Sequence, residues 1–133
     1  MIMSRFTSNQ TRAIVARGNV LVEAGAGAGK TSTLVERCIA WLLEGKARHS
    51  LDQILMVTFT EAAAAEMRQR IRETLTARLE KQPSDVHLAE QLALLETAHI
   101  STLHSFCLRL VREHFYELEI DPQCSVLAEE ETR

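Results

Sequence analysis

The sequence VLVEAGAGAGKT, residues 20–31, decides how the rest of this chain is interpreted. A short apolar run is followed by a loop of only Gly and Ala, and then by Lys30 and Thr31. After the loop, apolar residues recur at helical spacing from Leu34 to Leu43. Strand, small-residue loop, Lys-Thr and helix form the layout of a phosphate-binding P-loop. We therefore predict a strand at residues 20–23 and a helix that begins near Lys30.

The chemistry of a bound triphosphate explains these residue types. Glycines let the backbone wrap closely enough for its N–H groups to reach phosphate oxygens. The helix N-terminus adds free N–H groups and the positive end of its dipole. We expect Lys30 to reach the β- and γ-phosphates of ATP and the Thr31 hydroxyl to bind Mg²⁺. The loop residues of the predicted site are Ala24, Gly25, Ala26, Gly27, Ala28, Gly29, Lys30, Thr31 and Ser32.

One position departs from the strict pattern G-x-x-x-x-G-K-[ST], because Ala24 stands where the pattern has its first glycine. The match is therefore to a relaxed form. The alternative interpretation is a Gly/Ala-rich turn that caps a strand. The apolar run before the loop and the Lys-Thr and helix after it favour nucleotide binding.

Composition limits the class of protein. The chain has 133 residues, of which 46% are hydrophobic, so one domain or part of one can bury a core. No apolar run approaches the roughly 18 residues that a membrane span needs, and we expect a cytoplasmic protein without a membrane partner. The net charge of −3 means that any contact with DNA must be local. The three cysteines have no metal-ligand spacing and are interpreted as reduced structural thiols.

The rest of the chain alternates between strand and helix patterns. A helix is predicted after a cap at Thr7 or Ser8, followed by a sharp turn at Gly18. Residues 54–60 are typical of a second, buried parallel strand, and Thr60 is placed to cap a helix over residues 61–81. That helix carries many charges on its outer positions, and a solvated face explains them better than a phosphate contact.

The C-terminal half continues the alternation. Residues 83–85 break the chain and cap a shorter helix, residues 99–102 are weakly strand-like, and an apolar helical stripe runs from Leu103 to Glu119. Repeated strand–helix units predict an α/β fold with a parallel sheet flanked by helices.

Four segments together resemble the superfamily 1 helicases of the UvrD/RecB type. They are FTSNQ at residues 6–10, the P-loop AGAGAGKT at 24–31, TFTEAAAAEM at 58–67 and ISTLHSFC at 100–107. The first is similar to the family's adenine-reading Gln motif, and the others to its motifs I, Ia and Ib. The residues of motifs Ia and Ib, together with Ser32 after Lys-Thr, are most similar to those of the family's helicase–nuclease branch. An arginine contact to the nucleotide at position 32 is therefore not expected.

The resemblance implies a RecA-like ATP-binding domain and roles for particular residues. Gln10 would recognise adenine, while Phe59 and Thr60 of motif Ia and Thr102 and His104 of motif Ib would line a path for single-stranded DNA. The ring of Phe59 could stack on bases, and hydroxyl or imidazole groups could bind phosphates. From the residues alone, packing and capping explain these four positions equally well.

The family's Asp-Glu strand end and its arginines from a second RecA-like domain have no counterpart in this sequence. Residues 1–133 are therefore expected to be the N-terminal part of the first motor domain, with residues 84–97 and 120–133 leading toward an inserted helical subdomain. The implied partners are single-stranded DNA or DNA ends, the rest of a helicase chain and a nuclease subunit.

Two further hypotheses come from other classes. A different P-loop enzyme, such as a small kinase, would need a lid with arginines and an acceptor pocket, and motifs Ia and Ib argue against it. A non-catalytic remnant would bind ATP, DNA or a partner without turnover. A reading frame that continues beyond Arg133 into an Asp-Glu strand would favour the helicase over the remnant.

Overall fold

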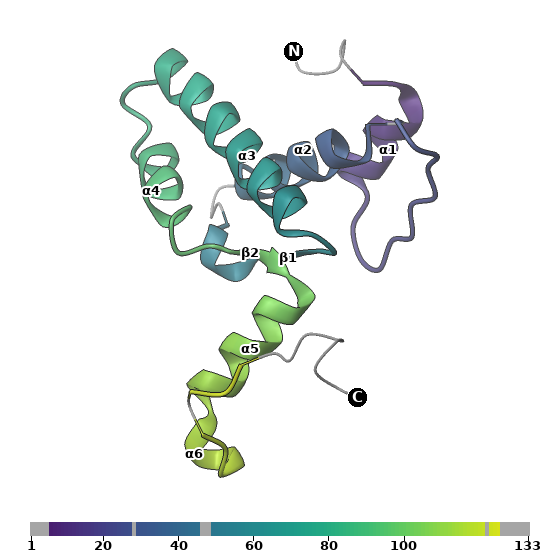
Figure 1. Cartoon of the computed structure of the whole chain (residues 1–133). Helices are drawn as coiled ribbons and strands as arrows, with labels where there is room; N and C mark the ends of the chain where they lie inside the picture. Colours follow the sequence, from purple (N-terminus) through teal and green to yellow (C-terminus); the bar gives the residue numbers. More distant parts are fainter. Residues whose placement is uncertain (1–5, 28, 46–48, 122, 126–133) are drawn as a thin grey trace.

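The computed structural model describes residues 6–27, 29–45, 49–121 and 123–125. Its elements in chain order are α1 (Ser8–Val15), α2 (Lys30–Leu42), the 3-10 turn η2 (Leu51–Gln53), β1 (Leu55–Thr58), α3 (Glu61–Lys81), α4 (Val86–Leu94), β2 (His99–Thr102), α5 (Leu103–Glu113) and α6 (Phe115–Leu118). Figure 1 shows α2, α3 and α4 on one side of the strands, while α5 and α6 extend away from them. Among the described residues, no helix has the length and apolar character of a membrane span.

The two strands form a parallel pair, which confirms the predicted α/β class. Leu55 lies opposite His99, and Thr58 lies opposite Thr102. The connection between the strands runs through α3 and α4. Strand β1 was predicted to be buried on both faces. That was wrong for the face that carries Leu55 and Val57, which are 47% and 41% exposed. A parallel strand is buried when both faces of its sheet are covered, and here only the other face contacts the core.

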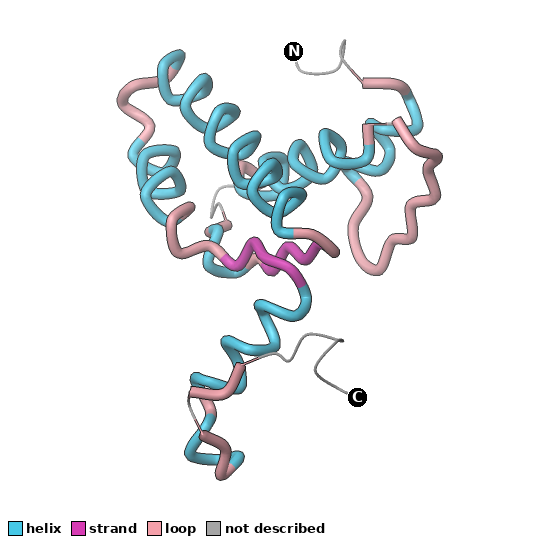
Figure 2. Tube along the Cα trace, in the orientation of Figure 1, coloured by secondary structure: helices cyan, strands magenta, loops and turns pink. Residues whose placement is uncertain are grey.

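The predicted strand at residues 20–23 is absent from the structure. These residues belong to a long loop between α1 and α2, drawn in pink in Figure 2. Leu21 is 87% exposed, which no strand inside a parallel sheet would be. A strand requires a ladder of hydrogen bonds to a neighbour. In the described part of the chain the only ladder joins β1 to β2, so the apolar run has no neighbour to pair with.

Helix α3 has the predicted bounds and organises the core. The Thr60 hydroxyl accepts a hydrogen bond from Ala63 N at 3.1 Å and caps the helix. Its outer face is held by ion pairs: Arg72 with Glu96 at 2.6 Å and Arg78 with Glu36 at 2.8 Å. The core consists of buried residues from α2, η2, α3, α4, the segment that joins α4 to β2, and β2. Its members are Val35, Cys38, Ile39, Leu42, Leu51, Met67, Ile71, Leu75, Leu88, Leu95, Ala98 and Ile100.

The three cysteines are free thiols that differ in burial: Cys38 is buried, Cys124 is half-buried and Cys107 is exposed. Cys38 is buried in α2, and desolvation raises the pKa of its thiol to about 12, as expected of a structural thiol. Cys107 is exposed on α5, so the interpretation of a structural thiol was wrong there. Helix α5 has no buried residue, because no described element covers its apolar stripe.

The C-terminal helix is shorter than predicted. The stripe from Leu103 to Glu119 is interrupted at His114, which separates α5 from α6, and Glu119 ends α6 in the left-handed region with φ of 52°. Helix α4 packs Leu88 into the core, and the role of residues 84–97 as a lead toward a subdomain stays a prediction. Most of the second predicted lead, residues 126–133, lies outside the described residues.

Candidate functional site

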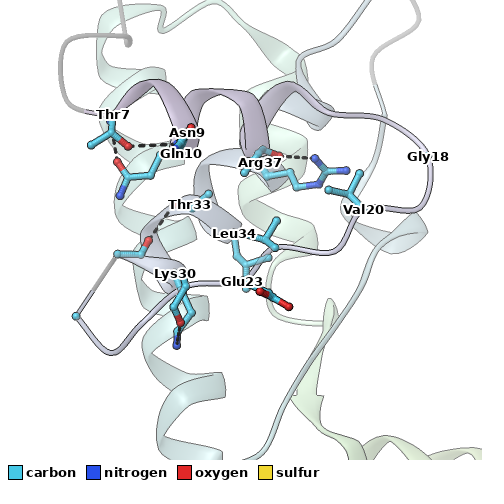
Figure 3. A pocket seen from close by; sticks show the side chains of 15 residues that line it. Thr7, Asn9, Gln10, Gly18, Val20, Glu23, Lys30, Thr33, Leu34 and Arg37 are labelled. Carbon is cyan, nitrogen blue, oxygen red and sulfur yellow. Dashed lines mark hydrogen bonds between the residues drawn. The ribbon is translucent and has the colours of Figure 1, made fainter.

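A cleft of about 870 Å³ lies between α1, the loop before α2 and the first turns of α2 (Figure 3). Of the predicted nucleotide ligands, five line it: Gln10, Ala24, Gly27, Gly29 and Lys30. Residues more than 15 positions apart in the sequence therefore meet at one cavity. The remaining described members of the predicted set are outside this lining, and Ala28 is outside the described residues.

Two glycines give the loop its shape. Gly27 and Gly29 both have φ of +74°, in the left-handed region that favours glycine. Gly29 is the N-cap of α2 and supplies no side-chain cap. The first N–H groups of α2, which have no partner within a helix, are therefore left for an anion at this end of the cleft.

Lys30 closes the loop in this conformation. Its exposed ammonium group donates a hydrogen bond from Nζ to the carbonyl oxygen of Ala24 at 3.0 Å. The same cation is within reach of an anion that enters the cleft, because Lys30 and Ala24 both line it. Thr33 also lines the cleft and donates from Oγ1 to the Gly29 carbonyl at 3.0 Å. Sequence reasoning missed Thr33, whose only signal is its position one turn after the last glycine.

Gln10 reaches the glycine loop from α1. Thr7 N donates to Gln10 Oε1 at 2.8 Å, and Gln10 N donates to Thr7 Oγ1 at 3.3 Å, which forms a capping box. A Cβ placed on Gly29 would lie 3.0 Å from Gln10 Nε2. Arg37 of α2 holds α1 in place, because its Nη1 donates to the Ala13 carbonyl at 2.5 Å. Arg37 lines the cleft as well, and sequence reasoning missed it.

Thr31 and Ser32 stand apart from the cleft lining. Thr31 is half-buried in the first turn of α2. Ser32 Oγ accepts a hydrogen bond from Arg70 Nη1 at 2.6 Å, and Arg70 also pairs with Glu66 at 2.6 Å. The residue after Lys-Thr therefore connects α2 to α3.

A second, smaller hollow of about 300 Å³ lies where β1 and β2 end. Three of the four predicted DNA residues line it: Phe59, Thr102 and His104. Phe59 is 98% exposed, which is unusual for a phenylalanine and fits a stacking surface better than packing. Thr102 is only 6% exposed, and its Oγ1 accepts from Ser105 N at 3.1 Å as the cap of α5. Thr60, the fourth residue, caps α3 beside the hollow.

Glu61 lines this hollow as well, and sequence reasoning missed its role there. Its Oε1 accepts hydrogen bonds from Ser105 Oγ at 2.7 Å and from Thr102 Oγ1 at 3.0 Å. These hydroxyls, with a smaller contribution from Arg68, lower the pKa of the Glu61 carboxyl below its ordinary value of 4.5. The available signal was an acidic residue in the first turn of a helix that directly follows the Thr-Phe-Thr sequence.

No cluster of three or more His, Cys, Asp or Glu residues forms a metal site within the described part of the chain. The described lining of the cleft offers the hydroxyls of Thr7 and Thr33, backbone and side-chain amide carbonyls, and the carboxylate of Glu23. Such ligands fit a Mg²⁺ ion that is held mainly by phosphate oxygens and water.

Comparison with known proteins gives a consistent result. The family described as the UvrD/REP helicase N-terminal domain matches residues 6–133. Three similar proteins each carry the name of an ATP-dependent helicase/nuclease subunit. They come from Moorella thermoacetica (53% identical over 123 residues, 92% of this chain and 9% of the relative), Anoxybacillus flavithermus (52% over 120, 90% and 10%) and Heliobacterium modesticaldum (52% over 128, 96% and 9%). The chain thus spans about a tenth of the length of these relatives.

Proposed function

This chain belongs to the UvrD/REP helicase N-terminal domain family, and we propose that it is the ATP-binding part of the first motor domain of a cytoplasmic, ATP-dependent DNA helicase of the helicase–nuclease type. The observation that carries this proposal is the cleft in which Gln10, the glycine loop and Lys30 meet. Gln10 and Lys30 are 20 positions apart in the sequence, yet both line one cavity, as residues of a common nucleotide site would. The match over nearly the whole chain supports a helicase over another kind of P-loop enzyme.

The groups in the cleft suit ATP. Lys30 would exchange its bond to the Ala24 carbonyl for one to a phosphate, which is a stronger, charge-assisted bond. The uncapped N-terminus of α2 would bind the same phosphates. Gln10 would present its amide to the adenine edge, which needs a donor and an acceptor. Mg²⁺ would be held by the Thr31 hydroxyl and phosphate oxygens, and would neutralise charge on the phosphates.

The hollow at the strand ends suits the predicted path of single-stranded DNA. An exposed aromatic ring at Phe59 and an exposed imidazole at His104 lie on one surface. Stacking on a ring tolerates any base, as a translocating motor requires. The proposed partners are DNA ends, a second RecA-like domain and a nuclease subunit, and the relatives' names, which call them subunits of a helicase/nuclease, support a multisubunit assembly.

We expect residues 1–133 alone to bind nucleotide without DNA-stimulated hydrolysis. Lys30 and Thr31 position phosphates and metal, but positioning is one part of phosphoryl transfer. An arginine finger alone contributes roughly 10³–10⁵ in rate in other P-loop enzymes. Phosphate release with and without single-stranded DNA is the measurement. A robust stimulated rate that Lys30→Ala removes would mean that this stretch carries its own water-activating carboxylate.

Titration calorimetry with Mg-ATP tests the nucleotide site. Lys30→Ala should abolish measurable binding, because the bound phosphates lose their main counter-charge. Lys81→Ala is the matched control, since Lys81 is an exposed lysine at the far end of α3. Equal Mg-ATP affinity of the parent and Lys30→Ala would remove the assignment.

A further inference from the structure

Helix α1 carries Gln10 to the nucleotide cleft but buries little surface of its own. It packs against α2, and among its described residues Ile14 alone is buried. A helix of 8 residues is marginal by itself in water. Burial of a single side chain does not set a direction, because hydrophobic attraction is non-directional. The orientation of α1 on α2 must therefore come from directional bonds.

Arg17 makes such bonds at the C-terminal end of α1. The last carbonyl groups of a helix have no partner within it, and Arg17 supplies one. Its Nη1 is within hydrogen-bonding distance of three carbonyl oxygens: Ile14 at 3.3 Å, Val15 at 2.8 Å and Ala16 at 3.1 Å. On the other edge of the guanidinium, Nε and Nη2 both donate to Glu44 Oε2 at 2.8 Å. Glu44 follows the end of α2, so Arg17 ties the end of one helix to the end of the other.

Arg37 attaches α1 to α2 at a second point. Its Nη1 donates to the Ala13 carbonyl oxygen at 2.5 Å, a bond drawn as a dashed line in Figure 3. Ala13 lies about 4.5 Å along the helix axis from Gln10. Two attachments fix the tilt of α1, and with it the height of Gln10 above the glycine loop. The resulting approach is close, because a Cβ on Gly29 would lie 3.0 Å from Gln10 Nε2.

We propose that Arg17, through its bond to Glu44, is a positioning residue for base recognition: it holds α1 so that Gln10 meets the base while the phosphates lie on the glycine loop. The inference rests on the proposed function, because it takes ATP as the ligand. Within the described chain, neither Arg17 nor Glu44 lines the cleft, so the pair would act through the place of Gln10 and not by contact. A hydrogen bond weakens steeply with poor geometry, so a small tilt of α1 is enough to lose one.

The ion pair itself is not a main source of stability. The Arg17 and Glu44 side chains are 40% and 45% exposed, and exposed pairs contribute little to folding. Variants of these two residues should therefore stay folded, and their effect on nucleotide binding can be measured.

Competition with a fluorescent nucleotide tests the proposal in Arg17→Met, which keeps an apolar stem and removes the guanidinium. Mg-ATP affinity should fall about three- to tenfold, and the ratio of ATP to GTP affinity should fall toward one. The affinity for inorganic tripolyphosphate should stay unchanged, because the glycine loop and Lys30 are intact. Equal losses for Mg-ATP and tripolyphosphate, with an unchanged ATP-to-GTP ratio, would mean a merely structural role and would overturn the inference.

Two further variants show whether Arg17 acts through Glu44. Glu44→Gln should give the same pattern with a smaller loss, because Arg17 keeps its bonds to the carbonyl oxygens of α1. The variant with both changes should lose no more Mg-ATP affinity than Arg17→Met alone, whereas losses that add would contradict a shared role. Arg72→Met is the matched control: it breaks the 2.6 Å ion pair with Glu96, and the Arg72 side chain is 42% exposed. It should leave the ATP-to-GTP ratio unchanged.

A measurement without nucleotide separates this inference from the proposed function. The nuclear Overhauser contact between the Gln10 side-chain amide and the α-protons of Gly29 should be present in the parent and weaker in Arg17→Met. A weakened contact in a chain that binds no Mg-ATP would support the positioning role of Arg17 and contradict the ATP site. A contact that is equally strong in Arg17→Met, in a chain that binds Mg-ATP, would overturn the inference alone.

Discussion

The two candidate sites of this chain are built in different ways. The nucleotide cleft is formed by a loop whose residues 21–27 are all exposed, and its lysine bonds to the loop's own carbonyl. The hollow at the strand ends is formed where a ladder, two helix caps and a carboxylate meet, with Thr102 buried at its base. The first site therefore depends on backbone conformation, and the second depends on hydrogen bonds between regular elements.

Core packing should give the largest contrast between the two regions. Ile71→Ala removes a side chain with 0% exposure from α3 and should lower the free energy of unfolding by about 2–5 kcal/mol. Leu21→Ala removes a side chain that is 87% exposed in the loop and should change it by no more than about 0.5 kcal/mol. Urea unfolding of the three proteins is the measurement. A large loss for Leu21→Ala would show that residues 20–23 pack as a strand after all.

The second largest effect is expected from adding a methyl group to the glycine loop of the nucleotide cleft. Gly29→Ala places a side chain where φ is +74° and where Cβ would lie 3.0 Å from Gln10 Nε2. The left-handed conformation alone costs roughly 1–2 kcal/mol for a residue with a Cβ, so Mg-ATP affinity should fall about tenfold or more. Gly25→Ala is the control, because its φ is outside that region and its Cβ would meet nothing within 4 Å. An equal loss of Mg-ATP affinity in Gly29→Ala and Gly25→Ala would mean that the loop changes shape when ATP binds.

Gln10→Ala should separate base recognition from phosphate binding within the cleft, because it removes the amide that we assign to adenine. The ratio of ATP to GTP affinity should fall toward one, while polyphosphate binding persists. Thr7→Ala is the matched variant: it removes the hydroxyl of the capping box and about 1 kcal/mol of helix stability, yet leaves the Gln10 amide in place. Both affinities come from competition with a fluorescent nucleotide. Equal binding of ATP and GTP by the parent would rule out the adenine role.

The smallest effect is expected from titration of Glu61 in the second site. Its folded-state pKa is lowered, so the stability that it contributes is present above the ordinary value of 4.5 and is lost as pH falls below it toward the folded value. The parent should therefore be more stable than Glu61→Gln at neutral pH, and the difference should shrink at acid pH. Thermal unfolding of both proteins between neutral and acid pH measures this difference. A difference that is unchanged at acid pH would mean that charge is not what holds α3 to α5.

Local features were predicted well wherever one residue and its near neighbours specify the outcome. Thr7 caps α1, Thr60 caps α3, and α3 ends at Lys81, because caps and helical periodicity depend on residues within a turn or two. The strand at His99–Thr102 had only a weak local signal, and its pairing with β1 is what establishes it. The P-loop interpretation depends on Lys30, Thr31 and the glycines before them, and the nucleotide-binding role of these residues stays a prediction.

Residues close together in the chain therefore specify the helix caps and the family to which the chain belongs, and they carry the prediction of a phosphate-binding loop. The loop conformation of residues 20–23 emerged only from the tertiary structure, because a strand needs a neighbour and the described chain offers none there. The same holds for the approach of Gln10 to Gly29, the bond of Ser32 to Arg70 and the bond of Glu61 to Ser105. These contacts join segments 19 to 44 residues apart, and no local pattern specifies which distant side chains will meet.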